Sequence, residues 1–121
     1  MEEENKKILE QLKEWNDNGE FQVNNERTYK LTGLSHAFRV EVVSLYSQIE
    51  AQIIMGNYAF LQREDFKKVM NKIDDRVLFN EMQISKLPKH FEEYPEDYLD
   101  YIAISMKVIS YPFYKAKLSI N

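Results

Sequence analysis

The stretch "LSHAFRVEVVSLYSQIEAQIIMGN", residues 34–57, carries the strongest periodic pattern in the chain. Its apolar residues recur at intervals of three and four: Leu34, Phe38, Val42, Leu45, Ile49 and Ile53. This spacing predicts an amphipathic helix whose apolar side faces the core. Ser35 or Thr32 can cap its start, and Gly56 can end it. We therefore expect the central core helix at residues 35–55.

Upstream, the segment "EFQVNNERTYKL", residues 20–31, changes the apolar period from about 3.6 to two. The pair Asn24-Asn25 lies between its two alternating runs, and asparagine tolerates the positive φ that tight hairpin turns require. The pattern predicts a β-hairpin that pairs residues 20–24 with residues 27–31.

Two strands alone are marginally stable in water, so the hairpin must pack on a helix or gain a third strand. The end of the chain, "YKAKLSIN", alternates Ala116, Leu118 and Ile120 with polar residues. It is the candidate third strand, either within this chain or offered to a partner.

Residues 2–16 predict a helix with one narrow apolar side, formed by Ile8, Leu9, Leu12 and Trp15. Gly19 is a natural left-handed cap after it. Two interpretations stay open: a surface helix packed on the domain, or a peripheral arm over residues 1–18 that docks on a partner.

Three further segments have helical patterns. The apolar side of the first is formed by Phe66, Val69, Met70, Ile73 and Val77, and Leu78 and Phe79 extend it. Residues 89–94 predict a short helical turn, and a buried helix is expected from Pro95 to Tyr111, where Pro112 ends it. Residues 82–87 fit either an extended piece or a poor helical turn.

These elements predict one domain over residues 1–121, mainly α with a small β element (α+β). We expect an N-terminal helix, a β-hairpin, then three to four packed helices and a candidate short C-terminal strand.

The composition of the chain argues against several classes of function. The net charge is −4, whereas nucleic-acid binders normally carry a basic balance or stripe. The absence of cysteine excludes disulfides, thiol catalysis and cysteine-based zinc sites. The N-terminus is acidic and polar, unlike a signal peptide, and no apolar run is long enough to span a membrane. We expect a cytoplasmic protein with no cofactor, no nucleic-acid partner and no membrane partner.

The stretch "FEEYPEDYLDYI", residues 91–102, is the densest acidic segment. His90 and Glu93 are spaced to share one face of a turn, and Glu96 and Asp97 add charge, so a metal or catalytic cluster is one interpretation. Such sites normally take ligands from several elements. A helix start explains the segment better, because Pro95 suits the first helical position and acids suit the positive end of the dipole. An acidic patch that faces a partner is the third interpretation. We assign no catalytic and no metal residues.

A second pair of acids, Asp74-Asp75, lies among lysines and Arg76 on the third expected helix. We interpret these acids as part of an ordinary solvated helix face.

Aromatic residues make up 13% of the chain, and several gather near the C-terminus. Tyrosine has a polar tip and is favoured at interfaces. This cluster either caps the core or exposes a partner-binding surface, and its members are Tyr94, Tyr98, Tyr101, Tyr111, Phe113 and Tyr114.

The order "FQVNNERTYKLTGL", a long amphipathic helix, another helix, and finally "HFEEYPEDYL" and "ISYPF" resembles tailed-bacteriophage tail assembly chaperones. The positions that carry the resemblance are Val23, Tyr29, Leu31, Leu34, Pro112 and Phe113. It covers roughly residues 20–114 as a pattern, without a diagnostic motif, and leaves residues 2–16 outside. It implies a non-enzymatic protein that binds the apolar, helical tape-measure protein and keeps it soluble while tube subunits polymerise around it.

We therefore expect a protein-binding phage or prophage protein, with a tail assembly chaperone as the first hypothesis. The alternative is a small phage-encoded inhibitor of a host defence or regulatory protein. A third hypothesis from another class is a metal-dependent enzyme that uses His90, Glu93 and Glu96. The expected partner is a protein, for the chaperone a tape-measure or tail-tube protein.

Overall fold

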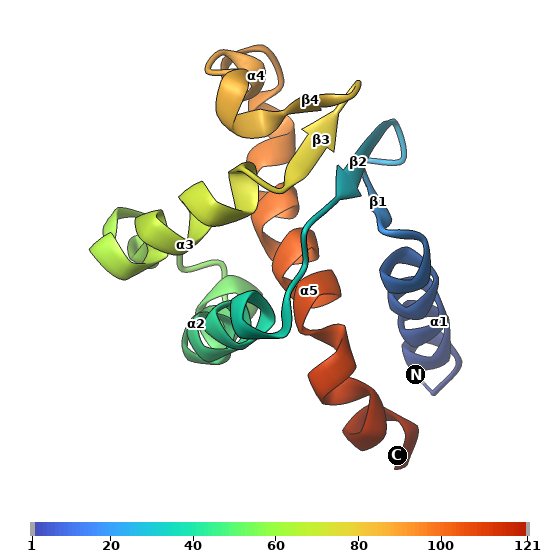
Figure 1. Cartoon of the computed structure of the whole chain (residues 1–121). Coiled ribbons are helices and arrows are strands. Elements are labelled where there is room, and N and C mark those ends of the chain that lie inside the picture. The colour runs from blue at the N-terminus through green and yellow to red at the C-terminus, as the bar shows by residue number, and fades with distance from the viewer. Residues whose placement is uncertain (1, 121) are drawn as a thin grey trace.

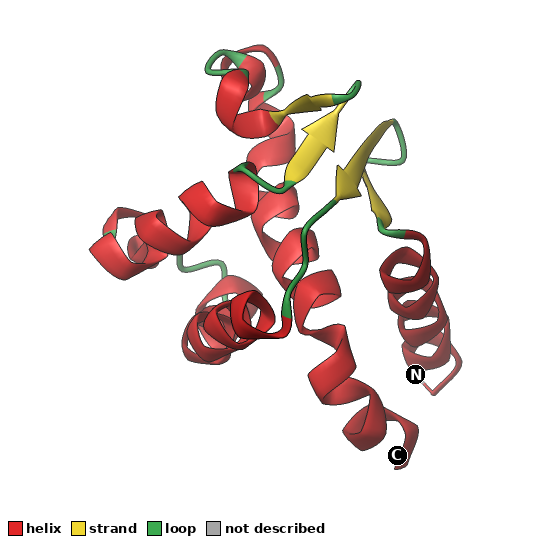
Figure 2. Cartoon of the chain, in the orientation of Figure 1, coloured by secondary structure: helices red, strands yellow, loops and turns green. Residues whose placement is uncertain are grey.

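The computed structural model describes the backbone of residues 2–120 and the side chains of residues 6–114. Its main elements are α1 (Glu2–Asn18), β1 (Glu20–Val23), β2 (Arg27–Leu31), α2 (His36–Ile54), α3 (Glu64–Asp74), β3 (Val77–Phe79), β4 (Met82–Gln83), α4 (His90–Glu93) and α5 (Tyr98–Ile120). Three short 3-10 helices, Ala59–Gln62 (η1), Ile84–Lys86 (η2) and Pro95–Asp97 (η3), connect them. Helices dominate and the strands form one small antiparallel sheet (Figure 2), which confirms the expected α+β class.

Helix α5 runs through the middle of the molecule, with α1 on one side and α2 on the other (Figure 1). The apolar residues that predicted α2 are buried as expected, from Phe38 to Ile49. Ser35 caps the helix, because its Oγ accepts a hydrogen bond from the Phe38 backbone N–H at 3.2 Å. Helix α1 packs against the core through Leu12 and Trp15, which favours the packed surface helix over the free arm.

The hairpin forms as predicted. Glu20 pairs with Lys30 and Val23 with Arg27, so that Phe21, Val23 and Tyr29 all have buried side chains. Asn24 and Asn25 both have a φ of 56°, the left-handed conformation expected for the turn.

The third strand is not where the sequence placed it. Val77–Phe79, expected to extend the third helix, is strand β3, which pairs with β2 through Lys30–Leu78 and Leu31–Val77. Helix α3 ends at Asp74, and β4 adds a fourth strand in the order β1-β2-β3-β4. The open edge of β2 is thus satisfied by a neighbouring segment. Residues 114–120, the predicted C-terminal strand, belong to α5 instead.

Pro112 does not end the last helix but lies inside α5. Proline removes one intrahelical donor and normally breaks or kinks a helix. Here α2 supports this turn of α5, because the Arg39 Nη1 donates to the Ile109 carbonyl at 2.8 Å. Over the described residues, none of the helices is long and apolar enough to cross a membrane.

The N-cap of α2 gives a test of the fold. Ser35→Ala removes the acceptor for the Phe38 N–H and is expected to lower the free energy of unfolding by about 1 kcal/mol. Urea denaturation measures the loss. Ser44→Ala is the control, since this exposed serine lies within α2, where alanine is the better helix former. A loss as large for Ser44→Ala would contradict the assigned cap.

Candidate functional site

The carboxylate of Asp97, in η3, has no exposed surface and lies at the centre of a polar network. Its Oδ1 accepts hydrogen bonds from Arg27 Nη2 and Asn24 Nδ2, both at 2.7 Å. Its Oδ2 accepts from the Tyr29 hydroxyl at 2.9 Å and from Arg27 Nε. The network therefore joins the hairpin to the start of α5 across about 70 positions of sequence.

His90 extends this network into α4. Its Nε2 lies 2.8 Å from the Tyr29 hydroxyl oxygen, and its side chain is buried. Because the single Tyr29 hydroxyl proton goes to Asp97, His90 must donate its Nε2 proton to that oxygen. Burial lowers the pKa of His90, which keeps the imidazole neutral.

Charge in the network is balanced by Arg27. Its hydrogen bonds to Asp97 hold the pKa of that carboxyl below the usual range, and the same contact raises the pKa of Arg27. The guanidinium also contacts Glu96 at 3.0 Å and lies 4.4 Å from the Tyr94 ring centroid. A buried carboxylate held by a bidentate arginine and two neutral donors is a structural anchor.

This geometry corrects the prediction that Asp97 serves only the start of a helix. It also separates the residues of the metal or catalytic hypothesis. Asp97 does more than complement a helix dipole, because it is fully buried and fixed by side chains from the hairpin. Of the three residues that the metal hypothesis names, His90 is buried against Tyr29, while Glu93 and Glu96 are exposed. Within the part of the chain whose side chains are described, no three His, Asp or Glu residues are grouped to hold a metal ion.

The residue that sequence reasoning missed is Arg27. Residues two apart in a strand share a face, so Arg27 lies on the same face of β2 as Tyr29 and Leu31, which both face the core. A charged residue at such a position requires a buried partner of opposite charge. The strand pattern therefore contained a signal for the anchor, although it could not identify Asp97.

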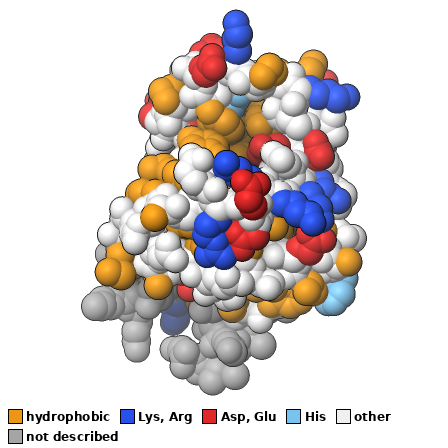
Figure 3. Space-filling view, turned by 90° about the vertical axis from the view of Figure 1, so that its left-hand side faces the viewer, with side chains coloured by type: hydrophobic (Ala, Val, Ile, Leu, Met, Phe, Trp, Pro, Cys, Tyr) orange, Lys and Arg blue, Asp and Glu red, His pale blue; other side chains and the backbone are white. Residues whose placement is uncertain are grey.

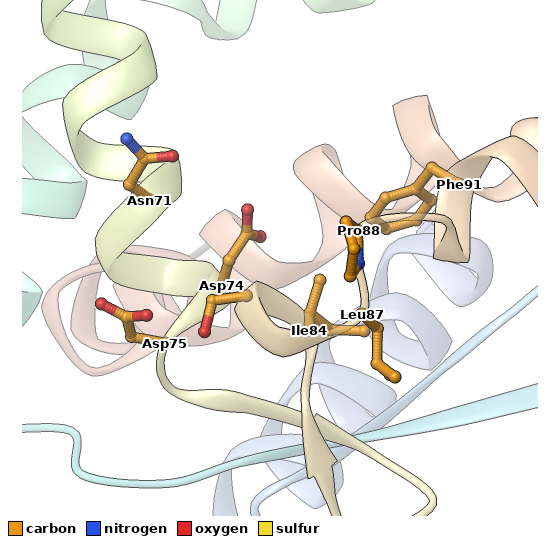
Figure 4. A pocket seen from close by; sticks show the side chains of 8 residues that line it. Asn71, Asp74, Asp75, Ile84, Leu87, Pro88 and Phe91 are labelled. Carbon is orange, nitrogen blue, oxygen red and sulfur yellow. The ribbon is translucent and has the colours of Figure 1, made fainter.

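A pocket of about 330 Å³ lies beside the network, between the end of α3 and the segment from η2 to α4 (Figure 4). Helix α3 supplies its polar side and the other segment its apolar side, with Asn71, Asp74, Asp75, Ile84, Leu87 and Phe91 in the lining. Asp74 was expected on a solvated helix face. It is instead half-buried, and its Oδ1 accepts a hydrogen bond from the Tyr101 hydroxyl at 2.7 Å.

Burial raises the pKa of Asp74 to about 6, and the nearby Asp75 carboxylate acts in the same direction. The hydrogen bond from Tyr101 opposes this shift only in part. Asp74 and Asp97 thus differ in their environment: arginine compensates the buried charge of Asp97, whereas Asp74 has a single hydroxyl donor.

The residues of the predicted aromatic cluster differ in their burial. Tyr101 has no exposed side-chain surface and lies in the core, so it cannot belong to an exposed partner-binding patch in this conformation. The other members are half-buried: Tyr94, Tyr98, Tyr111, Phe113 and Tyr114. The ring centroid of Phe113 lies 5.8 Å from that of His36, whose side chain is exposed. A partner-binding role for these five residues stays a prediction.

Comparison with known proteins gives no relative for this chain. No protein-family model matches it, and neither the curated proteins nor the solved structures contain a match.

Two neighbouring acids contact the Arg27 guanidinium, and we expect them to contribute very differently to the stability of the fold. Asp97→Asn keeps the size of the side chain but leaves Arg27 without its buried counter-charge, and is expected to cost roughly 3–5 kcal/mol. Glu96→Gln is the matched control and should change stability little, because Glu96 is 55% exposed. Urea denaturation of both variants measures the difference. Equal losses would contradict the structural role of Asp97.

Asp74 predicts a dependence of stability on pH. Its folded-state pKa of about 6 lies above its ordinary value of 3.8, so between these pH values the folded state retains a proton that the unfolded state has lost. The contribution of Asp74 to stability should therefore fall as pH rises from about 4 to 6, by at most roughly 3 kcal/mol. The lowered pKa of His90 acts in the opposite direction below about pH 6.5, so the effect of Asp74 is measured as the difference between wild type and an Asp74 variant. Asp97 acts in a different pH range. Because its pKa is depressed, its contribution to stability is lost only as pH falls below about 4.

Urea denaturation from pH 4 to pH 7 tests this. Asp74→Asn keeps an acceptor for Tyr101 and should remove the contribution of Asp74, so that stability between pH 4 and 6 changes more favourably with rising pH than in the wild type. Glu64→Gln, on an exposed position of the same helix, should retain that contribution. A wild-type slope in Asp74→Asn would show that another group titrates.

Proposed function

We propose that this protein is a non-enzymatic phage or prophage protein of the host cytoplasm, a tail assembly chaperone that keeps an apolar helical tail component soluble during assembly. The observation that carries the proposal is an exposed, uncharged side of α2, opposite the core. We call it the outer α2 face, and it consists of Ala37, Val40, Ser44, Ser47, Ala51 and Ile54.

The spacing of the outer α2 face suits a helical partner. Its members alternate at three and four residues, the repeat by which two helices pack along a common seam. Ala51 and the two serines are small, so a partner helix can approach closely. The Ser47 hydroxyl donates to the Ser44 carbonyl at 3.0 Å, which leaves it satisfied within its own helix.

The face ends in large exposed apolar side chains. Ile54 is 77% exposed, and the adjoining Met55 is 82% exposed. Methionine adapts its shape to different apolar surfaces and is common at binding sites. An amphipathic helix that lies along this face would cover both residues.

Charged residues border the face and favour solubility of the complex. Glu41 and Glu50 lie on its two sides along the helix, and Glu41 pairs with Lys72 of α3 at 2.7 Å. Figure 3 shows the side of the molecule where α2 and α3 lie, with basic and acidic side chains close together across its middle. Such a mixed surface keeps an exposed apolar seam from driving general aggregation.

The first test uses the neighbouring genes. A tail-tube gene upstream and a tape-measure gene downstream would support the proposal, and that tape-measure protein then becomes the binding probe. Co-expression with this chain should raise its soluble fraction and yield a complex. A stoichiometric complex with one host protein, and none with tail proteins, would contradict the chaperone and favour the inhibitor.

The second test locates the binding surface. Ala51→Glu places a charge in the middle of the outer α2 face and should abolish the complex without changing the fold. Gln48→Glu adds the same side chain to the same helix outside that face, where Arg63 already contacts it at 3.1 Å, and should bind normally. Co-purification and circular dichroism measure binding and folding. Normal binding by Ala51→Glu would exclude this face.

A further inference from the structure

The pocket beside α3 has an uncompensated negative charge. Asp74 and Asp75 both line it, and no ion pair reaches either carboxylate among the residues whose side chains are described. The two bases that flank these acids in sequence are engaged elsewhere. Lys72 pairs with Glu41 at 2.7 Å, and Arg76 donates to the Lys72 carbonyl at 2.9 Å.

The opposite wall is apolar. Ile84, Leu87 and Phe91 line the pocket across from the acids, and Ile84 is buried in the core cluster (Figure 4). A small hydrated metal ion would gain little from such a wall. A hydrocarbon stem would be removed from water by it, and an aromatic ring also attracts organic cations.

We propose that this pocket binds an organic cation, an alkylammonium or guanidinium group whose hydrocarbon stem lies against Ile84, Leu87 and Phe91. The cationic head donates hydrogen bonds to Asp74, whose Oδ1 already accepts one from Tyr101. The size of the pocket, about 330 Å³, suits a lysine or arginine side chain or a free amine of similar length. This site is independent of the outer α2 face and of the chaperone proposal.

Binding should compete with a proton at Asp74. The titratable groups that face this carboxyl are Asp75, the next residue in the chain, and Tyr98 and Tyr101 of α5, and none of them is a cation at neutral pH. A bound cation stabilises the ionised carboxylate and therefore lowers the pKa of Asp74 from about 6. Affinity should weaken as pH falls below about 6.

The experiment is an NMR titration of the full chain at constant ionic strength with n-butylguanidinium, n-butylammonium and the neutral n-butanol. Both cations should shift the backbone amide signals of Asn71, Asp75 and Ser85, and n-butanol should shift them much less. Asp74→Asn should weaken cation binding about tenfold, because a hydrogen bond to a charged group is lost. Glu64→Gln, an exposed acid on the same helix, should bind like the wild type.

Two further measurements identify the source of the ligand and test the site even if the Asp74→Asn variant does not fold. A Gly/Ser peptide with one arginine that binds more tightly than n-butylguanidinium identifies a protein side chain as the source, and tighter binding of the free cation identifies a small molecule. The carboxyl ¹³C signal of wild-type Asp74 should show a lower pKa at saturating cation, whether or not Asp74→Asn folds. Equal binding of n-butanol, unchanged binding by folded Asp74→Asn, or an unaltered Asp74 pKa would overturn the site.

Discussion

The buried carboxylate of Asp97 is the contact on which the arrangement of this small domain depends. A buried charge is tolerated only when it is paired and hydrogen-bonded. The side chains that donate hydrogen bonds to Asp97 all come from the hairpin. A two-stranded hairpin has little stability of its own, so its position must be fixed by β3 and by the helices. The Arg27–Asp97 pair adds a directional contact with η3 to the apolar packing and to the pairing of β2 with β3.

Contacts of β2 also hold the two walls of the pocket in place. Strand β3 pairs with β2, and it follows α3 after only two residues, so the end of α3 is held relative to the hairpin. On the other side, His90 of α4 contacts Tyr29 of the same strand. The two walls of the pocket are therefore tied to one strand by different contacts. This explains how the cavity between the end of α3 and the short segment from η2 to α4 is maintained.

The sequence predicts those elements whose signals are local. Helix α2 shows an apolar period over its whole length, and the hairpin has both alternation and a turn pair that tolerates positive φ. Val77–Phe79 was misassigned because a short apolar run fits the end of a helix as well as a buried strand. The alternation at residues 114–120 was a real pattern, but β3 already occupies the free edge of β2. Asp97 was misread because a helix start explains an acid in that position without any distant partner.

Asp97 and Asp74 show why residue type alone does not define a site. Both are acids near helix ends, yet Arg27 lowers the pKa of one, while burial without a cation raises the pKa of the other. The first arrangement stabilises the folded state at neutral pH, and the second weakens it. Departures from full charge compensation tend to be retained where a site serves a function. Asp74 lines a cavity with an apolar wall opposite, so the missing counter-charge is located where a ligand can supply it.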